Sequence, residues 1–107
     1  MTNISFTICE EPWKIFLLED EEFEKKFKEA LCGITLNDLR QIYICESELN
    51  FATVCHELTH AYYFYTCVQP ASIDADQMEE IFCEILAIHG QKIIDISKRL
   101  LSKLKRS

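Results

Sequence analysis

Residues 51 to 65 carry apolar side chains at helical spacing, and two histidines lie beside that apolar stripe. The stripe follows an i, i+3/i+4, i+7 pattern, which predicts a helix with one buried face. Its members are Phe51, Val54, Cys55, Leu58, Ala61, Tyr62 and Tyr65. Because His56 and His60 are four residues apart, their imidazoles are expected one above the other on one side of this helix.

His56, Glu57 and His60 form the pattern HExxH. Two histidine nitrogens on one helical face can converge on a zinc ion, and the glutamate after the first histidine can reach a water in the metal's open position. Glu57 is therefore the expected catalytic base, and Zn²⁺ the expected cofactor. The pattern has only three fixed positions, so an HExxH that binds nothing is one alternative.

A second helix is expected to follow the HExxH helix. Pro70 cannot continue a helix and lies in a turn-like stretch, from residue 68 to 72. Asp74 or Asp76 could serve as the N-cap of the next helix. That helix would carry a cluster of acidic side chains.

Two of those acids complete a familiar arrangement. Glu80 follows His60 by twenty residues, and Glu80 and Glu84 lie one helical turn apart. HExxH on one helix with ExxxE or ExxxD on a later helix resembles the gluzincin metallopeptidases. The resemblance implies that Glu80 is the third metal ligand and that Glu84 hydrogen-bonds a ligand histidine and orients its ring.

The flanking sequence extends this resemblance to residues 33–97. HELTHA and EExxCExxA are its most specific segments, whereas residues 1–32 match in general layout only. The chain looks like the small HExxH proteins of phage and prophage genomes, relatives of the ImmA/IrrE peptidases and of the minimal gluzincins. The resemblance implies a zinc metallopeptidase that hydrolyses a peptide or protein substrate. It would be selective or latent, because the second lobe with which full-size gluzincins clasp a substrate is missing.

Other third ligands fit less well. The metzincin pattern would need glycine at position 63 and histidine at position 66, where the chain has Tyr63 and Thr66. Glu79 lies about 100° from Glu80 on an ideal helix, and no acid follows it one turn later. His89 is nine residues beyond Glu80, so it is expected to face roughly the opposite way and to pack against other side chains.

The rest of the chain predicts an α+β fold with one domain over residues 1–107. Alternating or β-rich stretches predict strands over 4–8, 13–18, 34–36 and 41–45. Asp20 is expected to cap a helix from about 21 to 31, with Gly33 as its C-cap. We expect a small, mostly antiparallel sheet that packs on the HExxH helix and on a C-terminal helix that carries the third ligand.

The helix caps and the C-terminal helix can also be placed. Ser47 or Asn50 could cap the HExxH helix. The final helix is expected from about residue 75 to beyond 100. Gly90 is its weak point, because glycine costs up to ~1 kcal/mol relative to alanine in a helix.

The strand over 41–45 bears on substrate binding. The resemblance implies a sheet edge beside the metal, with which an extended peptide pairs; an ordinary internal strand is an equal alternative. Tyr43 and Tyr63 are candidates, by position only, for stabilising the tetrahedral intermediate. A packing role is favoured for both.

The six cysteines are scattered through apolar segments without a CxxC pair. With two glycines and two prolines, the chain is unlike a disulfide-rich secreted scaffold, so reduced and buried thiols are expected. A sharper alternative makes Cys9 or Cys83 a latency ligand of the zinc. Residue type alone suggests it.

The net charge of −7 is unevenly distributed, because residues 97–107 hold five basic side chains and no acids. This excludes a uniformly basic nucleic-acid surface. The basic end complements the dipole of a C-terminal helix, and docking on a partner is the minor alternative. Without a run of ~18 apolar residues or a signal-peptide pattern, the chain is expected in the cytoplasm and not in a membrane. The oligomeric state is left open.

A second functional hypothesis keeps the same fold without catalysis. In it, the chain is a phage accessory or regulatory protein, and the zinc site supports a protein-binding platform. The sequence identifies neither the substrate nor the biological process.

Overall fold

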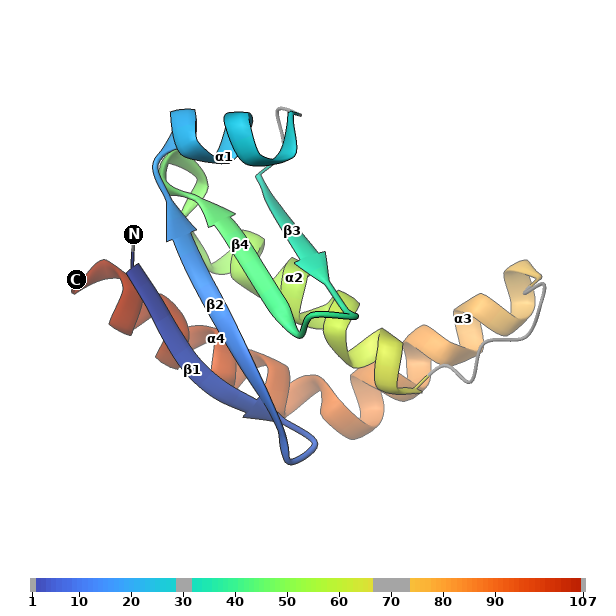
Figure 1. Cartoon of the computed structure of the whole chain (residues 1–107). Coiled ribbons are helices and arrows are strands. Elements are labelled where there is room, and N and C mark those ends of the chain that lie inside the picture. The colour runs from blue at the N-terminus through green and yellow to red at the C-terminus, as the bar shows by residue number, and fades with distance from the viewer. Residues whose placement is uncertain (1, 29–31, 67–73, 107) are drawn as a thin grey trace.

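A four-stranded mixed sheet forms the middle layer of the computed structural model, which describes residues 2–28, 32–66 and 74–106 (Figure 1). The strands are β1 (Thr2–Ile8), β2 (Glu11–Leu18), β3 (Gly33–Leu36) and β4 (Gln41–Cys45). Their order is β1-β2-β4-β3. The pairs β1–β2 and β3–β4 are antiparallel, as expected, whereas β2 and β4 are parallel. A parallel pair requires a long crossover, which here contains α1 and β3.

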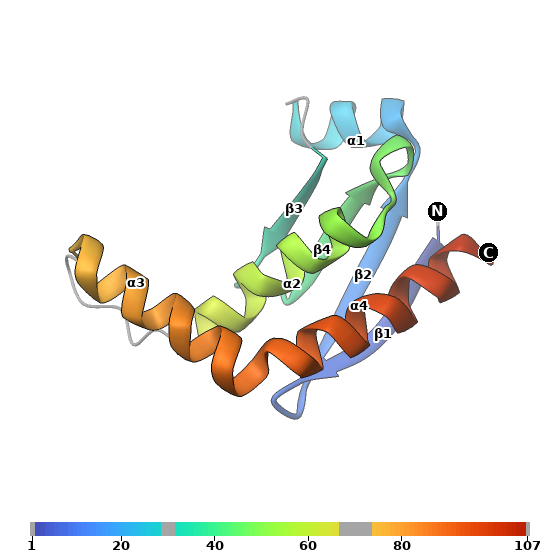
Figure 2. The ribbon, with the colours of Figure 1, turned by 180° about the vertical axis from the view of Figure 1, so that it is seen from behind.

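Helices cover both faces of this sheet. They are α1 (Asp20–Phe27), α2 (Phe51–Thr66), α3 (Ala75–Glu84) and α4 (Gly90–Lys105), with a 3₁₀ turn, η1 (Glu46–Glu48), and a π-helical segment, η2 (Ile85–His89). Figures 1 and 2 show α2 and α4 along one face and α1 across the end of the other. The predicted α+β class is confirmed.

Alternation along the strands divides the core between the two faces. Trp13 and Ile15 of β2 and Ile42 and Ile44 of β4 belong to the main core, which they share with α2 and α4. The intervening residues of these strands form a smaller core against α1. Its buried members are Leu18, Phe23, Tyr43 and Cys45. Alternate residues of β2 and β4 therefore pack into different cores, one on each face of the sheet.

The predicted apolar stripe of the HExxH helix is confirmed in the middle of α2, but its expected first member, Phe51, is exposed. Val54, Leu58, Ala61 and Tyr62 are all buried. Asn50 is the N-cap, since its Oδ1 accepts a hydrogen bond of 2.9 Å from the backbone N–H of Thr53.

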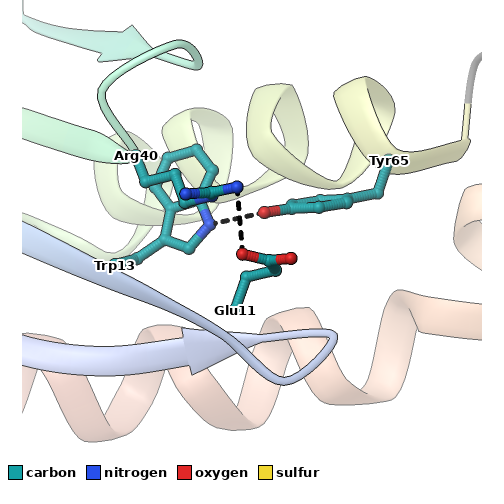
Figure 3. A network of polar contacts seen from close by, with 4 residues as sticks. All are labelled: Glu11, Trp13, Arg40 and Tyr65. Atoms are coloured by element: carbon teal, nitrogen blue, oxygen red, sulfur yellow. Dashed lines mark hydrogen bonds and ion pairs between the residues drawn. The ribbon is translucent and has the colours of Figure 1, made fainter.

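Polar contacts also tie the C-terminal part of α2 to the sheet (Figure 3). Trp13 donates from Nε1 to the hydroxyl oxygen of Tyr65 over 3.0 Å. Beside it, Arg40 and Glu11 form an ion pair of 3.0 Å between half-exposed side chains. An exposed pair of this kind contributes little to stability. The buried tryptophan and its hydrogen bond are the stronger constraint on the position of α2.

The expected role of Asp20 as a helix cap is wrong. The N-cap of α1 is Glu19, which makes no side-chain capping bond. The Asp20 carboxylate instead accepts hydrogen bonds from the Cys45 thiol (2.8 Å) and from the backbone N–H of Ser47 (3.0 Å). It thereby links the start of α1 to the end of β4 and the 3₁₀ turn that follows, which supply these two donors.

The end of α1 also differs from the expectation. Lys28, in the left-handed region with φ of 56°, is its C-cap, and its N–H bonds to the carbonyl of Glu24. Gly33 is the first residue of β3 and not a helix cap. The expected helical residues 29–31 lie outside the described part of the chain.

The long C-terminal helix is interrupted. Asp74 caps α3 in a capping box with Gln77, as one of the two expected caps. The π-helical segment η2 then separates α3 from α4 and ends directly before Gly90, the predicted weak point. The His89 ring packs on Tyr62 with 5.0 Å between centroids, so its expected packing role is confirmed.

The cysteines are less buried than expected. The five described ones carry free thiols, and of these Cys45 is buried and Cys55 half-buried. Cys9, Cys32 and Cys83 are exposed, so the expectation of burial is wrong for them. Cys67 lies outside the described residues. In the described parts of the chain, no helix is both long and apolar enough to cross a lipid bilayer.

Asp20 is expected to make stability depend on pH. Hydrogen bonds from Cys45 and Ser47 lower the pKa of its carboxyl in the folded state. The stabilisation is therefore present above the unfolded pKa of about 3.9 and is lost as pH falls through the lower folded value. Urea unfolding between pH 6 and pH 3 should show a smaller loss of stability in Asp20→Asn than in the wild type. Glu21→Gln, in the same helical turn, is the control and should follow the wild type. Parallel curves for Asp20→Asn and the wild type would contradict this account.

Candidate metal centre

His56 and His60 project from the exposed side of α2, one turn apart. Their Nε2 atoms are 3.1 Å apart, and their rings meet edge to face with 4.8 Å between centroids. Glu57 joins them in a group whose potential ligand atoms all lie within 4.8 Å of one another. The structure therefore brings together the three residues of the motif.

The two imidazoles fit a tetrahedral metal. With zinc–nitrogen bonds of about 2.05 Å, two ligand nitrogens of a tetrahedral site lie about 3.3 Å apart. The observed separation of 3.1 Å is close to this value. It is also a hydrogen-bonding distance, with the donor set by the tautomers of the two rings. The donor atoms are thus placed for a shared ion by the helix itself.

Glu57 lies on the buried side of the pair, with 5% of its surface exposed. The hydroxyl of Thr35, on β3, lies 2.7 Å from its Oε1 and 3.0 Å from its backbone carbonyl oxygen. A threonine hydroxyl has one proton, so it serves these two acceptors in a shared or alternating bond. Thr35 therefore orients the Glu57 side chain. Sequence reasoning missed this residue, because 22 positions separate it from Glu57 and no motif links the two.

Gly33 permits the close approach of β3 to Glu57. A Cβ atom at this position would lie 3.1 Å from Cγ of Glu57 and 3.1 Å from the carbonyl oxygen of Tyr43. These distances are shorter than ordinary van der Waals contact. The glycine is needed for the space beside Glu57, not for a helix end.

The strand beside the motif is β3 and not β4. Gln41–Cys45 is internal, between β2 and β3, so the alternative of an ordinary internal strand is the correct one. Gly33–Leu36 is one of the two edge strands, with β1 at the opposite edge, and its other long side is unpaired within the described sheet. Because the crossover places β4 beside β2, β4 is paired on both sides, and β3 lies at the edge of the sheet.

Glu80 and Glu84 are exposed on α3, and neither belongs to the group formed by the motif residues. The side chains of α3 that face the histidines are Met78 and Phe82, which line a pocket together with His56 and His60. On an ideal helix, Glu80 lies about 180° from the midpoint of Met78 and Phe82. The structure does not bring Glu80 to the histidines, so its role as third ligand and that of Glu84 as its partner stay predictions.

The two candidate tyrosines lie in different places. Tyr43 packs in the smaller core, where its ring stacks on Phe16 at 4.7 Å and its hydroxyl donates to Oε1 of Gln41 over 3.0 Å. The packing role is therefore confirmed for Tyr43. Tyr63 lines the pocket of the histidines and stacks on Phe82 at 5.6 Å, so it stays a candidate.

Two pockets meet at His56. The larger, of about 650 Å³, lies between α2 and α3, and the smaller, of about 380 Å³, lies beside Cys32, Gly33 and Glu57. His56 and Ala52 line both. The proposed latency ligands Cys9 and Cys83 line neither pocket and are not in the group of the motif residues.

The chain matches no family model, no curated protein and no solved structure. The chemistry of the site therefore has to be inferred from its own residues.

The hydrogen bond between Thr35 and Glu57 is expected to stabilise the fold. In Thr35→Val the buried carboxylate loses its donor, at a cost of about 1–3 kcal/mol in the free energy of unfolding. Urea denaturation should show this loss, while Thr35→Ser, which keeps the hydroxyl, should stay close to the wild type. Equal stability of the valine and serine variants would show that the bond does not hold Glu57.

Proposed function

We propose that this protein is a zinc-dependent peptidase of the gluzincin type. One observation carries the proposal: the Nε2 atoms of His56 and His60 are 3.1 Å apart, and the Glu57 carboxylate lies within the same 4.8 Å group. Two imidazoles would supply two of the three protein ligands of a hydrolytic zinc site, and the adjacent carboxylate would supply its base.

His56 and His60 would hold the ion, with Glu80 as the proposed third ligand. When bound, Zn²⁺ lowers the pKa of a water toward ~7 and polarises a peptide carbonyl. Glu57 would accept the proton of the attacking water and pass it to the leaving amine. Because Thr35 occupies Oε1 of Glu57, we expect Oε2 to accept that proton.

The edge of β3 is the proposed binding place for the substrate main chain. This strand lies beside the motif, and the smaller pocket opens between Gly33, His56 and Glu57. An extended peptide paired with β3 would pass close to both the base and the metal ligands. Tyr63 is the remaining described candidate for stabilising the tetrahedral intermediate. We expect the protein to act in the cytoplasm, where free thiols such as Cys9 and Cys32 stay reduced.

A non-catalytic binding platform is the second candidate, and the position of α3 favours it. In the described arrangement, α3 presents Met78 and Phe82 to the histidines and leaves Glu80 in solvent. A site with two protein ligands falls one short of the three that catalytic zinc sites use.

Metal content and hydrolysis together test the peptidase. Protein purified without chelator should contain close to one zinc per chain by elemental mass spectrometry, and His56→Ala should lose it. Glu57→Gln should keep the zinc but lose about 10²–10⁴-fold in the rate of peptide hydrolysis, because it removes the base. An unchanged rate in Glu57→Gln, or no zinc uptake by the wild type, would contradict the proposal. Retained zinc without any hydrolysis by the wild type would support the binding platform.

A matched pair of variants tests the third ligand. Glu80→Ala should weaken zinc affinity strongly, because it removes one of three protein ligands. Glu79→Ala, an exposed neighbour with the same charge, should leave the affinity unchanged. Competition with a chromophoric chelator measures both. Equal affinities would show that α3 does not supply Glu80 to the metal.

A further inference from the structure

The strand β1 forms the edge of the sheet that lies opposite β3. It pairs with β2 over seven residues, without a bulge, and no described strand lies on its other side. Its sequence, TNISFTI, contains neither a charged residue nor a proline. Edge strands are usually protected from pairing with other chains by charges, prolines or bulges. The edge of β1 lacks these protections and can accept a further strand.

Every second residue of β1 directs its backbone groups to this open edge. Lys14, the partner of Ser5 in β2, donates its N–H toward β4, to the carbonyl oxygen of Arg40 over 3.1 Å. Ser5 and Lys14 are therefore a non-hydrogen-bonded pair, and in an antiparallel ladder such a pair directs its N–H and C=O groups to opposite outer sides. The pair of Thr7 with Pro12, which has no N–H, agrees with this alternation.

Two copies of this edge match each other about a two-fold axis. In an antiparallel pair centred on Ser5, Ser5 faces Ser5 of the second copy and Asn3 faces Thr7, so that all outward N–H and C=O groups find partners. The exposed side chains of these three residues are short and polar, and they can hydrogen-bond across the strands. On the other face, Ile4 would lie opposite Phe6. Because Ile4 is only half-buried in one chain, this pairing would cover more apolar surface.

The charges near the two ends of β1 also complement each other in this arrangement. The helix α4 contacts β1, and its C-terminal end, with Lys105 and Arg106, lies beside the start of the strand (Figures 1 and 2). The other end of β1 leads into a turn that carries the exposed Glu10. Antiparallel pairing would bring the basic end of each copy toward the acidic turn of the other, which favours association.

We infer that β1 is a dimer interface, through which the four-stranded sheets of two copies join into one continuous sheet. Because β1 pairs with itself, the assembly closes at two chains, whereas pairing of β1 with β3 of another copy would continue as an open chain. The interface lies at the edge opposite β3. The inference therefore does not depend on the proposed peptidase, and the dimer leaves the proposed peptide-binding edge uncovered.

Sedimentation equilibrium tests the interface. The wild type should have twice the mass of one chain at micromolar concentration. Ser5→Pro removes an N–H that points away from β2, so it should give a folded monomer, with folding checked by circular dichroism. Ser5→Ala is the matched control, because it keeps the N–H, and it should stay a dimer.

Two double variants test the register without a proline. Asn3→Lys combined with Thr7→Lys places like charges opposite each other across the two-fold axis, and should raise the Kd of the dimer about tenfold or more. Asn3→Lys combined with Thr7→Glu changes the same two positions but pairs opposite charges, so it should keep the wild-type Kd or lower it.

Three results would overturn the inference. One is a wild type that stays monomeric at submillimolar concentration, and another is a dimer that persists in folded Ser5→Pro. The third is an equal Kd for the two double variants, because residues 3 and 7 would then not face each other. Failure of zinc binding or hydrolysis would leave all of these measurements unchanged, so the two proposals are tested separately.

Discussion

The candidate site depends on the burial of one face of α2 against the sheet. Val54, Leu58 and Ala61 are fully excluded from solvent, and their packing fixes the orientation of the helix about its own axis. With this rotation set, His56 and His60 face outward and Glu57 points toward β3. The distance between the two imidazoles is then a result of helix geometry, and the direction of the carboxylate is a result of packing.

The strand β3 supplies the contacts that position the Glu57 side chain. Thr35 supplies the hydrogen bond that a nearly buried carboxylate requires, and Gly33 supplies the space for its Cγ. Both residues belong to β3, which lies at one edge of the sheet. One strand thus orients the proposed base and offers the proposed pairing edge for a peptide.

The helix α3 shows a competition between burial and charge. Met78 and Phe82 turn toward α2, while Glu80 and Glu84 stay in water. Covering an unpaired carboxylate costs free energy, whereas partial burial of apolar surface is favourable, so the apolar side chains take the side of α3 that faces α2. This is the physical reason why an ExxxE pattern alone does not place its glutamate.

Local sequence determined the parts of this protein that depend on neighbours along the chain. The buried middle of the α2 stripe, the spacing of its two histidines and the period-two strands were predictable, and Asn50 and Asp74 were each one of two expected caps, because each feature arises from residues within a turn or two. Tertiary structure alone decided that β4 is internal, that Thr35 holds Glu57, and that Asp20 bonds to Cys45 and not to its own helix. These features join residues more than twenty positions apart, and their partners depend on the strand order that the crossover from β2 to β4 imposes.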